Sequence, residues 1–199
     1  MQLKRTLELS KMVNEKMSTD DADELEQLKD NMKDLMVSPI GWHTMGIPLL
    51  ISFVLSLLAF TVPQTSIWET VFSLMAWPDK ALSGGVIVTG FIYCLVMFPS
   101  LTLIARGNHT ALKTYINLIY FTLAVVAIYF LKTLISALFG GSVTTFTLIS
   151  SCIGMVFVLV ALSCLNSHLF FKSNAFYLHN RVWRKQLKLR NKTHSKLSH

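Results

Sequence analysis

Residues 144–171, TTFTLISSCIGMVFVLVALSCLNSHLFF, contain no Asp, Glu, Lys or Arg. A helix needs about 20 apolar residues to cross the hydrocarbon core of a bilayer. Three further apolar runs of this length lie at about 42–62, 84–105 and 112–138. The glycine pair at 140–141 separates the last two runs and predicts a tight turn between them. The sequence therefore predicts four transmembrane helices.

The composition points to the same class of protein. Of the 199 residues, 52% are hydrophobic and 15% are charged, and the mean hydropathy is +0.50. A soluble domain carries about 25% charged residues. Together with the long apolar runs, these figures exclude a soluble enzyme domain, a disordered chain and a secreted disulfide scaffold.

Positive charge is concentrated at one end of the chain. Residues 172–199 contain eight Lys or Arg and no acid, whereas residues 1–36 contain six Lys or Arg and nine Asp or Glu. Arg106 and Lys113 lie in the loop between the second and third runs. Because Lys and Arg accumulate on the cytoplasmic side, both termini are expected in the cytoplasm. Short loops and compactness favour the bacterial inner membrane.

These patterns predict an all-α integral membrane four-helix bundle. Its transmembrane domain spans 39–171, between a cytoplasmic helical hairpin at 1–38 and a basic cytoplasmic tail at 172–199. The second helix of the hairpin is expected to begin near 18–21, where Ser, Thr and Asp are typical of helix starts. This helix carries one apolar stripe, formed by Leu25, Leu28, Met32, Leu35 and Met36. The stripe must be covered by the hairpin, by other copies, or by a separate protein. Electrostatic pairing of the acidic hairpin with the basic tail is a further alternative.

A short helix is predicted over 66–77, between the first two spans. Ser66 and Glu69 have the spacing of a capping box, in which the two side chains satisfy backbone N–H groups. The aromatic side chains of this helix are Trp68, Phe72 and Trp77. Since Trp is enriched at membrane interfaces, we expect an extracytoplasmic interfacial helix that acts as a sensing element.

The basic tail is a second candidate interaction surface. It combines one aromatic residue with adjacent cations: Arg181, Trp183, Arg184 and Lys185. Such a helix fits the anionic inner leaflet, where each cation adds about 1 kcal/mol of attraction. Docking of an acidic cytoplasmic partner is the alternative interpretation. No recognition motif accompanies the charge, so no direct nucleic-acid contact is expected.

No signature of catalysis or metal binding is present. The sequence lacks HExxH, GxSxG and Walker-type motifs, and its six histidines share no ligand spacing. We therefore expect no enzymatic activity, no metal and no cofactor. Lys132 is the one charge well inside a predicted span. It either snorkels to the headgroups or contributes to a pore or anion site.

Small residues at helical spacing predict packing seams. Ser52 and Ser56 share one face of the first span, and Gly85 and Thr89 share one face of the second. Such residues let transmembrane helices approach closely. The seams are expected within the bundle, and outward-facing ones favour a homo-oligomer.

The layout of residues 1–36, the outer helix 66–77 and the tail 172–199 around four spans resembles the small membrane component of Kiwa-type bacterial antiphage systems. It also resembles four-span immunity proteins that protect bacteria from pore-forming colicins. The first resemblance implies a membrane sensor that works with a cytoplasmic effector. We therefore predict a non-catalytic sensor or anchor that recruits or regulates a cytoplasmic protein. The alternatives are an immunity protein and a small homo-oligomeric channel or transporter.

Overall fold

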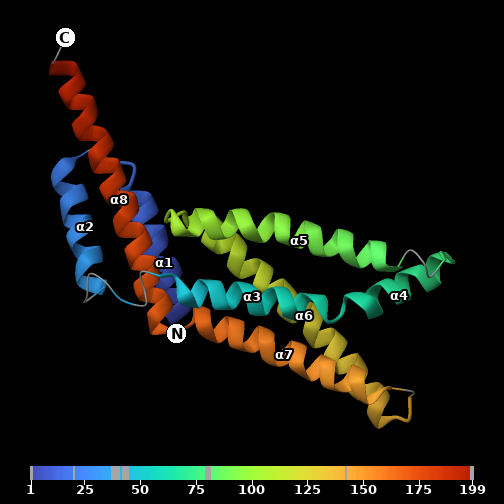
Figure 1. Ribbon diagram of the computed structural model, residues 1–199. Coiled ribbons are helices and arrows are strands. Elements are labelled where there is room, and N and C mark those ends of the chain that lie inside the picture. Colours follow the sequence, from blue (N-terminus) through green and yellow to red (C-terminus); the bar gives the residue numbers. More distant parts are fainter. Residues whose placement is uncertain are drawn as a thin grey trace. The chain divides into compact units, whose positions relative to one another are not determined.

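The computed structural model describes residues 2–19, 21–36, 41, 45–78, 82–141 and 143–197. Within these ranges every regular element is an α-helix, which confirms the all-α class (Figure 1). The helices are α1 (Gln2–Lys16), α2 (Ala22–Met36), α3 (Ile47–Thr61), α4 (Gln64–Met75), α5 (Leu82–Ala105), α6 (His109–Leu138), α7 (Thr145–Leu165) and α8 (His168–Leu197). The predicted span start at 42–44 and the predicted domain boundary at 38–39 lie outside the described residues.

Four stretches of helix are long and apolar enough to cross a membrane. They are Ile47–Met75, Leu82–Ala105, His109–Leu138 and Thr145–Leu165. By length and composition, these four stretches are candidate membrane spans. Large apolar side chains are widely exposed on these helices, as for Ile87 of α5, which is 70% exposed.

The first candidate span runs through α3 into α4. By itself α3 has 15 residues, about 22 Å of helix against a hydrocarbon core of about 30 Å. Pro63 joins the two helices in a right-handed helical conformation, and its carbonyl accepts a bond from the Ile67 N–H at 3.0 Å. The predicted capping box is wrong, because α4 begins at Gln64 without a side-chain cap. The helical conformation of Pro63 starts the helix before Ser66.

The chain forms two compact units. The first, which we call the head, contains Met1–Leu49, Ser100–Thr114 and Leu165–His199. The second, the span unit, contains Leu50–Pro99 and Tyr115–Cys164. The helices α3, α5 and α6 each contribute residues to both units. The predicted hairpin and the predicted basic tail therefore belong to one head.

The helix α7 ends at Leu165 rather than at the predicted residue 171. The Ser167 Oγ accepts a hydrogen bond from the Phe170 N–H at 3.1 Å, which caps the start of α8. The neighbouring Asn166 Oδ1 accepts a bond from the Leu3 N–H at 3.0 Å. Asn166 and Ser167 thus interrupt the apolar run because their side chains cap two different helices.

The turn between α5 and α6 is closed by backbone hydrogen bonds. The Asn108 N–H donates to the Leu103 carbonyl at 3.0 Å, and the Gly107 N–H donates to the Ile104 carbonyl at 2.7 Å. This pair of bonds forms a Schellman motif, in which Gly107 adopts a left-handed conformation. Its φ is +78°. The Asn108 Oδ1 then accepts the Ala111 N–H at 3.2 Å and caps α6.

Gly107 also meets the head helix α8. A Cβ at this position would lie 2.9 Å from the Tyr177 carbonyl oxygen and 3.2 Å from the Arg181 Cβ. Gly140, in the predicted glycine turn between α6 and α7, has no such close neighbour. Its φ is +77°, yet nothing lies within 4 Å of a Cβ there. Ser142 of that turn lies outside the described residues.

We predict that Gly107→Ala destabilises the protein more than Gly140→Ala does. Both substitutions add left-handed backbone strain of about 1–2 kcal/mol. Only Gly107→Ala adds a backbone clash, worth about 1–3 kcal/mol more. Thermal unfolding in detergent, followed by far-ultraviolet circular dichroism, measures the difference. Equal losses of stability would mean that α8 does not pack against this turn.

Candidate functional site

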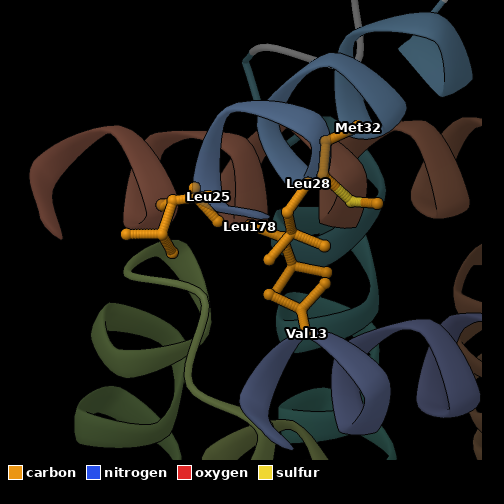
Figure 2. Packing of buried hydrophobic residues seen from close by; sticks show 6 residues of the cluster. Val13, Leu25, Leu28, Met32 and Leu178 are labelled. Carbon is orange, nitrogen blue, oxygen red and sulfur yellow. The ribbon is translucent and has the colours of Figure 1, made fainter. Parts of the chain in front are cut away.

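The apolar stripe of α2 lies in the core of the head. Leu25, Leu28 and Met32 are at most 2% exposed. They pack against Val13 of α1 and against Leu178 of α8, as Figure 2 shows. The chain itself therefore covers the stripe.

This packing changes the prediction for the partner site. The partly buried Leu35 packs against the same core. A partner cannot reach Leu25, Leu28 or Met32 while the head is folded, so the partner hypothesis no longer rests on the stripe. The reason is that α8 supplies a matching apolar face, in which Leu178 and Val182 are fully buried.

Charge pairing between the acidic hairpin and the basic tail is limited. The Gln186 Nε2 of α8 donates to the Glu26 Oε2 of α2 at 2.8 Å. Lys29 bonds the same carboxylate, and these two hydrogen bonds lower the pKa of Glu26. Among the described residues the other ion pairs lie within α1. Apolar packing, rather than ion pairs, therefore joins α2 to α8.

Two arginines of α8 bind the carbonyl end of α5. The Arg181 Nη1 donates to the Gly107 carbonyl at 2.8 Å, and its Nη2 donates to the Asn14 Oδ1 at 2.9 Å. The Arg184 Nη2 donates to the Arg106 carbonyl at 3.1 Å. The last carbonyls of a helix lack partners within that helix and carry partial negative charge. Arg184 therefore caps the end of α5, and Arg181 binds the turn that follows it.

Lys185 does the same for α1. Its Nζ donates to the Met17 carbonyl at 2.7 Å and also bonds the Thr19 carbonyl, both just beyond the end of α1. Three of the cations predicted to bind a partner thus hold helix ends inside the head. The sequence could not indicate this role, because the carbonyls lie more than 70 positions away along the chain.

Trp183 is the exposed apolar member of that predicted set. Its side chain is 50% exposed. Leu187 lies one helical turn further along α8 and is 38% exposed. Residues four apart share one face of a helix. Trp183 and Leu187 therefore form an exposed apolar pair on the head.

A pocket of about 500 Å³ lies in the head beside the α5–α6 turn. Its lining consists of Met17, Arg106, Arg181, Arg184, Lys185 and Lys188. We call it the basic pocket, because five cations and no acid line it. Burial, and to a lesser extent the neighbouring Arg184, lowers the pKa of the Arg181 guanidinium. Arg181, Arg184 and Lys185 were predicted as interaction residues, whereas the participation of Arg106 and Lys188 depends on the fold.

In the span unit, the predicted sensing helix is attached to α5. The Trp68 Nε1 of α4 donates to the Thr89 Oγ1 at 2.8 Å. A Cβ at Gly85 would lie 2.6 Å from the Trp68 ring, so the indole packs directly on the glycine. The predicted small-residue face of Gly85 and Thr89 is confirmed as a seam, and Trp68 fills it.

The other two aromatic residues of this element differ in exposure. Phe72 is 4% exposed, whereas Trp77 is 53% exposed. Their rings make an edge contact with centroids 5.3 Å apart. Of the three predicted sensing residues, Trp77 therefore presents its ring to the surroundings, and Trp68 and Phe72 hold the helix in place.

Lys132 lines a cavity of about 370 Å³ in the span unit, together with Ser66, Thr70 and Tyr129. The remaining lining is apolar, and no second cation takes part. Polar groups deeper in the unit are paired with each other. Ser52 and Tyr115 share a hydrogen bond of 2.7 Å. An ion path through Lys132 stays a prediction.

The comparisons with known proteins do not indicate a function for this chain. A scan against family models, a search of curated proteins and a search of solved structures each found no match. Among the described residues, no group of three or more His, Cys, Asp or Glu side chains could hold a metal ion. The basic pocket and the exposed Trp183 are therefore the candidate functional features of the head.

We predict that Arg181→Leu loosens the α5–α6 turn. The substitution removes two charged hydrogen bonds, each worth about 1.5–3 kcal/mol when well formed. Hydrogen–deuterium exchange of amides in 100–114 should become at least about tenfold faster. The control is Arg190→Leu, which removes an exposed cation of the same helix outside the pocket. Similar exchange in both variants would contradict the capping role.

We predict that Trp68 and Thr89 are energetically coupled. Trp68→Phe and Thr89→Val should each lower the stability by about 1 kcal/mol, because each removes the same hydrogen bond. The double variant should lose clearly less than the sum of the two. Trp77→Phe serves as the control, with little expected change at this exposed site. Additive losses in thermal unfolding would show that the indole bond contributes nothing.

Proposed function

We propose that the chain is an integral protein of the bacterial inner membrane that crosses it four times, with both termini in the cytoplasm. The four apolar helices support the crossing. Arg106, Lys113 and the basic α8 all belong to the head, and cytoplasmic flanks are rich in such residues. The exposed apolar side chains of the span unit then face lipid or further copies of the chain.

We propose that this protein is a non-catalytic sensor or anchor for a cytoplasmic protein. The observation that carries the proposal is the bond between the Arg181 guanidinium and the Gly107 carbonyl. Gly107 lies in the turn that joins two candidate spans, and Arg181 lies on the central helix of the head. A displacement of the turn therefore acts directly on α8.

The apolar core of the head connects α8 to α1 and α2, so a displacement of α8 also acts on these two helices. The helix α8 packs against α2 through Leu178, and it holds the end of α1 through Lys185. The head is thus a folded body whose three helices share one core, rather than a pair of independent extensions. A sensor needs an element with two states that both sides can bias. The α5–α6 turn and α8 are the elements we assign to this role.

The exposed pair Trp183 and Leu187 is the proposed contact for the cytoplasmic partner. Exposed aromatic residues dominate many protein interfaces. The proposed setting is antiphage defence, in which α4 and Trp77, two residues beyond its end, register an event at the membrane.

We predict that the full-length protein, captured from its native membrane in mild detergent, brings down one soluble protein in stoichiometric amount. Trp183→Ser with Leu187→Ser should reduce this recovery at least about tenfold, because interface hot spots often contribute 2 kcal/mol or more. Met12→Ser is the control, since Met12 is an exposed apolar residue of α1 at 37%.

Native mass spectrometry counts the copies of each chain. Recovery of the same soluble protein with all three forms would place the contact elsewhere on the head. Recovery of further copies of the chain alone would overturn the anchor proposal and leave the immunity-protein and channel hypotheses. Conductance of Lys132→Ala in planar bilayers would then separate those two.

A further inference from the structure

The basic pocket combines residues from one face of α8 with the end of α5. Its α8 residues, at 181, 184, 185 and 188, have the spacing that places side chains on one side of a helix. Arg106 directly follows the last residue of α5. The pocket therefore lies at the level where a candidate span ends.

The lining of the pocket is positively charged. Five cations line it without an acid, and like charges at short range repel each other. A guanidinium carries five N–H donors. Besides its bond to the Arg106 carbonyl, the Arg184 group donates from Nε to the Asn180 carbonyl at 3.1 Å. Arg181 and Arg184 thus each use two donors among the described residues. Donors remain for an anion that enters the pocket.

We propose that the basic pocket binds the phosphate of an anionic phospholipid headgroup. A phosphate matches the fork of N–H groups on arginine and accepts several charged hydrogen bonds at once. The position at the end of α5 places the pocket in the headgroup layer, which favours a lipid over a soluble phosphate ester. This inference rests on the proposed membrane crossing of α5 and α6, and it is independent of the cytoplasmic partner.

Two side chains allow the pocket to be tested without disturbing the fold. Arg106 and Lys188 are exposed, and within the described ranges neither side chain makes a hydrogen bond or ion pair. Arg106→Gln with Lys188→Gln therefore removes two pocket charges and leaves the α8 caps in place. Arg190→Gln with Lys192→Gln removes two exposed charges from the same helix outside the pocket and is the matched control.

The experiment titrates the full-length protein in detergent with phosphatidic acid or phosphatidylcholine and counts retained lipids by native mass spectrometry. Wild type and control should retain phosphatidic acid at least about tenfold better than phosphatidylcholine. The pocket variant should lose about tenfold in affinity for phosphatidic acid, since each cation near an anionic surface contributes to binding. Glycerol phosphate, added in excess as a soluble headgroup, should displace little of the lipid.

Other results would overturn the proposal. Equal loss in the control variant would mean that the general charge of α8 binds the lipid, without a pocket. Displacement of the lipid by equimolar glycerol phosphate would assign the site to a soluble phosphate ester. Alkaline extraction of membranes reports insertion separately. A protein released by that treatment would instead refute the membrane crossing itself.

Discussion

The apolar contact between α2 and α8 is the interaction on which the head depends. An isolated helix as short as α2, with 15 residues, is marginal in water. Its two ends and its outer face are charged, so its stability comes from the buried stripe. Leu25, Leu28 and Met32 supply that stripe, and Leu178 and Val182 receive it. Without this contact the head would expose two complementary apolar surfaces to water.

The helix α8 combines this apolar role with a polar one. Its buried side joins α1 and α2, while Arg181, Arg184 and Lys185 take up the carbonyl ends of α1 and α5. A helix end left without partners in a buried place costs stability. One helix thus closes the ends of two others, and the long basic run of the sequence has a structural reason besides attraction to lipid.

Features that depend on neighbouring residues could be predicted from the sequence. The apolar stripe of α2, the glycine turn after α6 and the four apolar helices all follow from composition and periodicity within short windows. The break at Asn166 and Ser167 could not be predicted, because two polar residues at the end of a hydrophobic run are equally typical of an interfacial end. Their capping bonds decide the break, and one of them reaches Leu3.

The candidate site could be predicted only in part, because it too depends on contacts between residues far apart in the chain. The cations of α8 are conspicuous in the sequence, but their carbonyl partners and the position of Arg106 beside them depend on the fold. The sequence predicts that the stripe of α2 is buried. Periodicity alone could not identify α8 as the helix that buries it. The start of α4 directly after Pro63 was not predicted, although proline is tolerated where a helix begins.

The cap that Asn166 gives to α1 has a consequence for how the protein is made. The donor, Leu3, leaves the ribosome well before the acceptor, which lies 163 positions later in the chain. The cover for the α2 stripe, on α8, is made later still. The head therefore assembles only after all four apolar helices have been synthesised. Until then the apolar stripe of α2 stays exposed while translation continues, and a membrane surface or a chaperone can shield it.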